Sequence, residues 1–214
     1  MRKKAFHSEI SLSRRILFQR LLGMGGMIAT GTFLEACSNN SPTYYTLSPM
    51  PGKILSGGPA IIEVRTPSIA SSLDRDRIVS ETGSYQLGLT SGAAWSEALN
   101  SMIGRITALN LSQRLPNSRI FAQNQATFTQ PDAYVELDIS RFNKDSKGNA
   151  VVTASIAVHK ANANVALVGH NQLLNLENAP KGSSTSDLVE TLSALLGRIA
   201  DITAQYLIAL PRRS

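Results

Sequence analysis

The chain has 214 residues, of which 43% are hydrophobic, 17% charged and 6% aromatic, and its formal net charge is +6. This length fits one domain or two small ones, and the composition excludes a disordered, collagenous or multi-span membrane protein. Residues 1–36 hold six Lys/Arg against two Asp/Glu, so most of the positive charge precedes the main body of the chain. A nucleic-acid-binding surface on that body is therefore not supported.

Residues 1–36 are predicted to be an export signal. A basic segment is followed by an uncharged, glycine-rich stretch at 21–34, and these 14 residues are too few to cross a bilayer, which takes about 20. Ser13-Arg14-Arg15 precedes the stretch and resembles the twin-arginine export signature. Arg14 and Arg15 would be its recognised pair, and the general secretory route is the alternative.

The signal ends at the only cysteine of the chain. Leu34-Glu35-Ala36-Cys37 resembles a bacterial lipobox, in which the thiol takes a diacylglyceryl group before cleavage after Ala36. We expect Leu34 and Ala36 to serve processing and Cys37 to be the acylated N-terminus of a tether over 37–43. Acylation also removes a lone thiol from an oxidising compartment. Ser38 at the second position favours transfer to the outer membrane. An ordinary cleavage site beside a free thiol is the alternative.

A single domain is predicted over 44–210, followed by a short tail at 211–214. Strands are expected at 44–47, 60–64, 77–81, 85–89, 119–121, 134–142, 151–159 and 165–176. Loops are expected at 48–59 and 178–184, and a turn at 68–76. Apolar residues recur at steps of three and four over 95–115 and from Ser186 to Pro211, which predicts two long amphipathic helices.

The second half of the chain indicates how the strands pair. In 134–142, Val135, Leu137 and Ile139 alternate with polar residues, and two further strands follow after polar turns. This pattern predicts an antiparallel meander with one solvated face. The fold class expected is α+β, a mixed, largely antiparallel sheet with both helices packed on one face.

Catalytic chemistry is poorly supported by the sequence. It contains no nucleophile elbow, metalloprotease or phosphate-loop motif, so no enzyme activity, cofactor or metal is expected. His159 and His170 fall in predicted strands and are interpreted as ordinary strand residues. Asp74 and Asp76 flank Arg75 in what is interpreted as a solvated turn. Trp95, at the start of a predicted apolar stripe, is interpreted as a core residue or a partner contact.

Several short motifs in order along the chain resemble one known family. They are YYTL at 44–47, LDR at 73–75, WSEAL at 95–99, NLS at 110–112 and VELDISRF at 135–142. In this order and after a lipobox, they resemble the ABC-type transport auxiliary lipoproteins, the PqiC/YmbA-like family. The resemblance implies a non-enzymatic, outer-membrane-anchored periplasmic domain that works with an MCE-type lipid-transport protein.

Within that resemblance, Leu73, Asp74, Arg75 and Trp95 are the candidate partner contacts, and homo-oligomerisation is left open. Two alternatives come from other classes of protein. A lipoprotein that binds a small apolar ligand predicts a sizeable apolar cavity between helices and sheet. A lipoprotein hydrolase predicts His159 or His170 within hydrogen-bond reach of a serine and an acid.

Overall fold

The structure is a computed structural model that describes residues 41–123, 130–161 and 169–211. The predicted signal peptide, Cys37 and most of the tail lie outside these residues. The described part contains two helices, α1 (Leu99–Arg114) and α2 (Thr185–Ala209). Its strands are β1 (Thr43–Tyr45), β2 (Ile61–Val64), β3 (Ser68–Ile69), β4 (Arg77–Gly83), β5 (Gln86–Trp95), β6 (Arg119–Ala122), β7 (Ala133–Lys144), β8 (Ala150–Lys160) and β9 (Gly169–Asn178).

All nine described strands belong to one mixed sheet built around β7. β7, β8 and β9 form an antiparallel meander, as predicted. On its other edge, β7 meets β2 and β3 in parallel, and β2 pairs in parallel with β6. β4 joins the far end of β7 at Ser80 and Lys144, and β4 and β5 form an antiparallel hairpin. The α+β class is confirmed.

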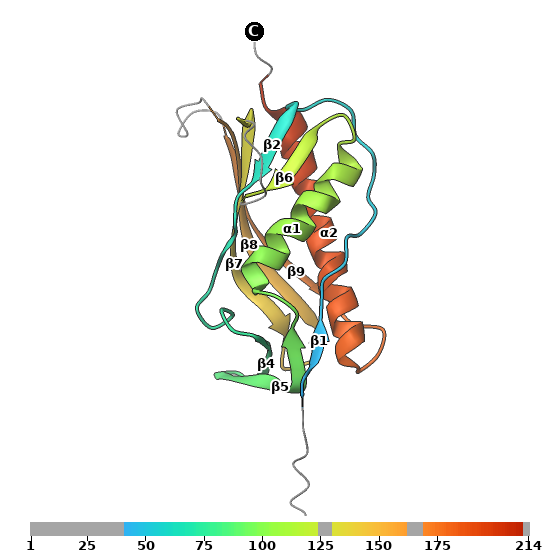
Figure 1. The fold of residues 1–214 in the computed structure, drawn as a ribbon. Helices are drawn as coiled ribbons and strands as arrows, with labels where there is room; N and C mark the ends of the chain where they lie inside the picture. Colours follow the sequence, from blue (N-terminus) through green and yellow to red (C-terminus); the bar gives the residue numbers. More distant parts are fainter. Residues whose placement is uncertain (1–40, 124–129, 162–168, 212–214) are drawn as a thin grey trace, which may run out of the picture. The chain divides into compact units, whose positions relative to one another are not determined.

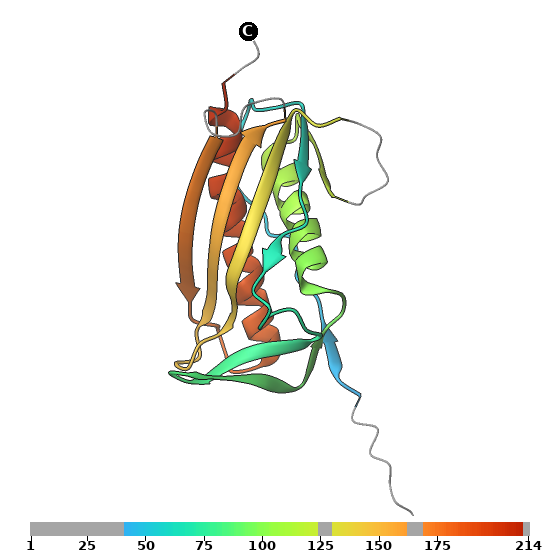
Figure 2. The ribbon, with the colours of Figure 1, turned by 90° about the vertical axis from the view of Figure 1, so that its left-hand side faces the viewer.

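Both helices cover the same face of the sheet, as expected (Figures 1 and 2). The alternation in β7 explains this arrangement, because Val135, Leu137 and Ile139 are buried while Asp138 and Ser140 are exposed. The apolar side chains of β7 and β8 pack against the buried stripes of α1 and α2 in one core cluster. The opposite face of the meander has no helix over it within the described residues (Figure 2).

The first helix is shorter than predicted. Trp95 ends β5, and α1 begins only at Leu99, with Ala98 as an N-cap that makes no side-chain hydrogen bond. Trp95 and Leu99 are both buried and four residues apart, so a periodicity of apolar residues could not separate the strand end from the helix start. Pro116 follows the C-cap residue Leu115, where the helix was expected to stop.

The second helix begins with a capping box. The Ser184 side chain accepts a hydrogen bond from the backbone N–H of Asp187, and the Asp187 carboxylate accepts one from the backbone N–H of Ser184. Lys181, in the loop before the helix, donates from its Nζ to Glu190, one turn after Asp187, at 2.8 Å. This contact raises the pKa of the Lys181 amine.

Two strand predictions need correction. The turn expected over 68–76 contains β3, which pairs with Asp138 and Ile139 of β7. The strand expected over 165–176 starts in a segment outside the described residues and is seen from Gly169 onwards. Among the described residues, no helix combines the length and apolar character that a membrane span requires.

Candidate functional site

One end of the domain, here called the base, gathers the features that could serve docking. It is formed by β1, the β4–β5 hairpin and the turn 145–149 between β7 and β8 (Figures 1 and 2). β1 pairs in parallel with the end of β5, with Thr43 beside Ala93 and Tyr45 beside Trp95. The chain that follows the predicted lipobox therefore enters the domain at this end.

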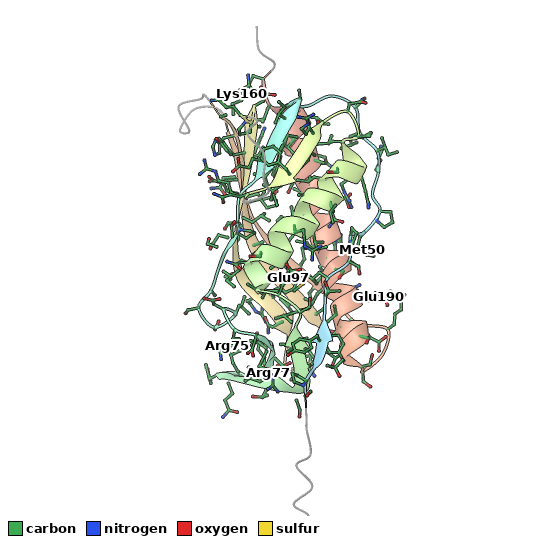
Figure 3. All side chains as sticks on the ribbon, viewed as in Figure 1. Met50, Arg75, Arg77, Glu97, Lys160 and Glu190 are labelled. Carbon is green, nitrogen blue, oxygen red and sulfur yellow. The ribbon has the colours of Figure 1, made fainter. Side chains whose placement is uncertain are left out.

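The turn predicted over 68–76 carries the candidate contacts Leu73, Asp74 and Arg75, and we call it the predicted docking turn. It is held by backbone hydrogen bonds. Ala70 N–H donates to Ile139 O at 2.9 Å, and Leu73 N–H donates to Ala70 O at 2.8 Å. Trp95 N–H donates to Asp76 O at 2.7 Å, which ties the end of the turn to β5. Figure 3 shows Arg75 and Arg77 at the lower end of the molecule, far from Lys160.

The four candidate partner contacts divide into two groups. Leu73 and Trp95 are each only 3% exposed and belong to the core cluster, where Trp95 lies 6.2 Å from Phe142 between ring centroids. Asp74 and Arg75 are exposed. Leu73 thus anchors the turn from inside, and only Asp74 and Arg75 are placed where a partner could touch them. The prediction of partner contact is kept for these two residues.

A polar concavity of about 460 Å³ lies where the tether meets the hairpin. Its lining consists of Ser41, Pro42, Thr43, Arg77, Ser91 and Gly92. The Arg77 guanidinium is oriented by its Nε, which donates to Ala93 O at 3.1 Å. Gly92 has φ of +64°, a left-handed conformation, and it lies where the register of the β4–β5 pair shifts between Leu89 and Ala94.

A buried arginine fixes the segment that follows β1. Arg114, at the end of α1, is 1% exposed, and its Nε donates to Asp201 of α2 at 2.6 Å. Its other donors reach the backbone oxygens of Met50, Asn110 and Gly197 at 2.9–3.0 Å. Because these acceptors come from three segments far apart in sequence, no local pattern predicts them.

The fit around this guanidinium leaves no spare room. A Cβ added at Gly52 would lie 2.3 Å from Arg114 Cζ, so any other residue at this position would have to displace the bonded guanidinium. Met50 N–H also donates to Asn110 Oδ1 at 2.6 Å. The chain from the tether is therefore clamped onto both helices, and we call Met50, Gly52, Asn110, Arg114 and Asp201 the arginine clamp.

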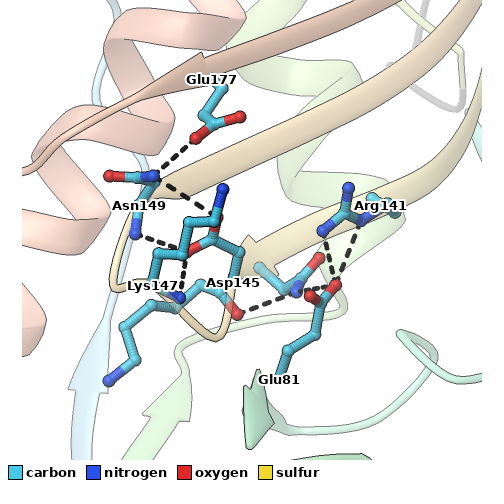
Figure 4. Close-up of polar contacts among 8 residues, drawn as sticks. Glu81, Arg141, Asp145, Lys147, Asn149 and Glu177 are labelled. Carbon is cyan, nitrogen blue, oxygen red and sulfur yellow. Dashed lines mark hydrogen bonds and ion pairs between the residues drawn. The ribbon is translucent and has the colours of Figure 1, made fainter. Parts of the chain in front are cut away.

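A second network holds the hairpin against the sheet (Figure 4). Glu81 of β4 accepts from Arg141 Nε at 3.1 Å and Nη2 at 2.6 Å, and from Asn143 Nδ2 at 3.1 Å. Next to it, Asn149 in the turn before β8 donates to Glu177 of β9. Three donors from two residues of β7 thus converge on one Glu81 oxygen, Oε1, and charge-assisted bonds of this kind are stronger than neutral ones, so the hairpin is tied to β7.

The features that the alternative functions require are not seen in the described residues. His159 lies 3.6 Å from Glu136 and contacts the Lys160 carbonyl oxygen, and His170 stacks on Tyr206 at 4.8 Å between ring centroids. Neither described histidine has a hydrogen-bonded serine. A cavity of about 190 Å³ beside α1 is mixed in lining, with the Glu97–Arg105 ion pair among its residues.

The residues predicted for processing and anchoring are Arg14, Arg15, Leu34, Ala36 and Cys37. All of them lie outside the described residues. The first described residue, Ser41, stands four positions after Cys37. Their roles therefore stay predictions from the sequence.

Solved structures share the fold at low sequence identity. An uncharacterized protein has a TM-score of 0.64 at 15% identity, over 77% of this chain and 97% of its own. Protein XCC0632 from Xanthomonas campestris has a TM-score of 0.59 at 16% identity, over 78% of this chain and 95% of its own. No curated protein sequence matches the chain. The family model "ABC-type transport auxiliary lipoprotein component" matches residues 45–204, and the chain belongs to this family.

Proposed function

We propose that this protein is a periplasm-facing lipoprotein, held in the outer membrane by acyl chains on Cys37, that serves an MCE/ABC-type lipid-transport system as a docking component. Membership of the transport auxiliary lipoprotein family supports the general role. The lipobox supports acylation of Cys37, and Ser38, the residue after it, supports placement in the outer membrane.

The observation that carries the proposal is the way in which the chain enters the domain. Ser41 is four residues after Cys37, and β1 starts at Thr43, so a fully extended tether of six residues reaches at most about 20 Å. An acylated Cys37 would keep the base within that distance of the membrane surface. Two or three acyl chains anchor a protein stably, and confinement to a thin layer raises its effective concentration for a partner that bridges the envelope.

The exposed part of the predicted docking turn supports a binding role. Asp74 and Arg75 stand on a turn whose backbone is fixed by Leu73 inside the core, so their side chains are presented from a rigid support. Arginine is enriched among residues that dominate binding energy at interfaces. The partner chemistry we propose is a periplasmic MCE-type protein with an acidic or polar patch facing Arg75.

The anchor is tested by the intact mass of the protein extracted from membranes. We expect a chain that starts at Cys37 and carries added acyl mass, found in the outer-membrane fraction. A soluble chain with an unmodified thiol would contradict the proposal, and recovery in the inner-membrane fraction would contradict the location.

The transport role is tested by affinity purification of the acylated protein and by deletion of its gene. We expect an MCE-type protein to co-purify and the deletion to weaken the outer-membrane barrier against detergents and large antibiotics. Re-expression of the acylated protein should restore the barrier, whereas a Cys37→Ser variant should not. An unchanged barrier together with no co-purified MCE-type protein would overturn the transport role.

A further inference from the structure

The β4–β5 hairpin at the base carries exposed apolar side chains, mainly on β5. Tyr85 at the hairpin tip is 100% exposed, and Leu87 and Leu89 on β5 are 57% and 49% exposed. Tyr44 on β1, which pairs with β5, is 65% exposed. Large apolar side chains that are exposed as a group mark surfaces that contact something else.

The segments that contain β5 and β1 carry no charge of their own. Residues 82–96, which include all of β5, contain no Asp, Glu, Lys or Arg, and neither do residues 37–52, which include the tether and β1. The β1–β5 pairing brings these two uncharged runs together in space. Burying the side chains of β1 and β5 would therefore remove no ionic group of these two strands from water. Arg77 and Glu81 of the neighbouring β4 lie opposite Ala94 and Leu87 and would meet the polar headgroups.

The hairpin is presented rigidly rather than folded back on the domain. Glu81 is held by Arg141 and Asn143 of β7, and Ser80 Oγ lies 2.9 Å from Thr90 Oγ1 across the hairpin. Leu87 pairs with Glu81 and Leu89 with Val79, so the hairpin's register is fixed as well. The exposed apolar side chains are thus a permanent feature of the base.

One edge of β5 has unpaired backbone groups. β1 covers only Ala93 to Trp95, and among the described residues no strand pairs with that edge over residues 86–91. Free N–H and C=O groups are not tolerated in the hydrocarbon core of a bilayer, but water and lipid headgroups can satisfy them. This edge therefore fits the interfacial layer and excludes deeper insertion.

We propose that the β4–β5 hairpin is a membrane-contacting element, in which Tyr85, Leu87, Leu89 and Tyr44 lie at the headgroup level of the bilayer that holds Cys37. The inference rests on the proposed lipid anchor. Thr43 is bonded to β5 and is only six residues from Cys37, so the tether cannot hold this end far from the lipid surface. Tyrosine is enriched at membrane–water interfaces because its ring is apolar and its hydroxyl is polar.

The main competing occupant is a strand of another protein. An exposed apolar edge can pair with a second copy of the chain or with a partner strand. The bilayer is favoured because both uncharged runs meet where the tether enters, which is where a short anchor brings the surface. In the anchored protein, contact adds to the binding by the acyl chains and orients the domain.

The test uses the full mature chain with an artificial anchor, so that it does not depend on acylation. A Cys37→Ser chain with an N-terminal polyhistidine tag is bound to vesicles of phosphatidylethanolamine, phosphatidylglycerol and a nickel-chelating lipid. A Leu87→Cys substitution then supplies the only cysteine, which carries an environment-sensitive NBD label. The control label is placed by Asn117→Cys in the exposed turn after α1, away from the base.

We expect NBD emission at position 87 to rise at least about twofold on vesicles and to be quenched by nitroxide lipids labelled near the headgroup. The label at position 117 should not change. Adding Tyr85→Ser and Leu89→Ser to the Leu87→Cys chain should abolish the rise without lowering the melting temperature, since both side chains are exposed.

Three results would overturn the proposal. They are an unchanged signal at position 87, an equal rise at both positions, and a rise at position 87 without vesicles that follows protein concentration. The last result would mean that the hairpin binds a second copy of the chain, and sedimentation would show the resulting oligomer. An unmodified Cys37 in the native protein would instead contradict the proposed lipid anchor. The intact-mass measurement tests the anchor independently of the vesicle experiment.

Discussion

At the scale of single residues, Arg75 and Arg114 show that residue type alone does not determine whether an arginine is exposed or buried. Arg75 is exposed on a turn, and Arg114 is buried with partners on both helices and on the segment after β1. The exposure of Arg75 follows from its place between two acidic residues in a predicted turn. The burial of Arg114 does not follow from its helix, because its acceptors at Met50 and Gly197 come from other segments.

The arginine clamp should be a main contributor to stability. We expect Arg114→Met to lower the free energy of unfolding by about 3 kcal/mol, since several buried acceptors lose their donor at once. The matched control is Arg198→Met on the exposed side of α2, which should change it by less than about 0.5 kcal/mol. Urea denaturation of both variants gives the comparison, and equal midpoints would show that the clamp is dispensable.

Arg75 should matter for binding and not for folding. Arg75→Ala should leave the melting temperature unchanged, because the side chain is exposed and its turn is held by backbone bonds. Co-purification with the MCE-type partner should fall at least about tenfold, as for a truncated interface arginine worth about 2 kcal/mol. The control is Arg119→Ala, another exposed arginine, at the start of β6. Full recovery of the partner with the Arg75 variant would remove this residue from the interface.

At the scale of elements, prediction succeeded where the local pattern determines the structure. The alternation in β7 and β8 identified both strands and the buried face, and Ser186-Asp187 placed the start of α2 within two residues of Thr185. The parallel pairs of β2 with β6 and β7 were not predicted, because a short strand of four residues carries no mark of its partner. The start of α1 was wrong because Trp95 and Leu99 fit one helical stripe.

The second helix should depend on its buried stripe. Leu195, in the middle of α2, is 1% exposed, so Leu195→Asp places a carboxylate without a partner in the core. We expect a loss of about 3–5 kcal/mol of unfolding free energy, a large part of the total for a domain of this size. Gln205→Asp on the exposed side of the same helix is the control. A melting temperature that stays unchanged for Leu195→Asp would mean that this stripe faces a partner in solution.

At the scale of the whole molecule, the chain belongs to a family of lipoproteins, and its domain closes through contacts that are distant in sequence. β1 pairs with β5, and β2 with β7, so neither pair can form before much of the chain has been made. Such topologies fold slowly compared with chains of local contacts. Export of an already folded domain, as twin-arginine signals allow, would separate folding from transport.

The export route can be decided by a charge-preserving change. Arg14→Lys with Arg15→Lys keeps the charge of the signal but removes both guanidinium groups, which lysine does not replace. If the twin-arginine route is used, the processed form should disappear and the precursor should accumulate. Arg2→Lys with Arg20→Lys serves as the control with the pair intact. Normal processing of the first variant on an immunoblot would assign export to the general secretory route.

The direction of β1 determines how the domain responds to mechanical load. A pull on Ser41 along β1 stretches its bonds to β5 together, in shear, instead of opening them one after another. Behind this short strand, Met50 is bonded to Asn110 and Arg114 of α1, and Arg114 is bonded to Asp201 of α2. Force that passes β1 is therefore received by both helices. A pull from the predicted anchor would first strain the pairing of β1 with β5, then the bond from Ser48 to Ser193, and then the arginine clamp. The chain is thus fastened to both helices 13 residues after Cys37, the predicted anchor.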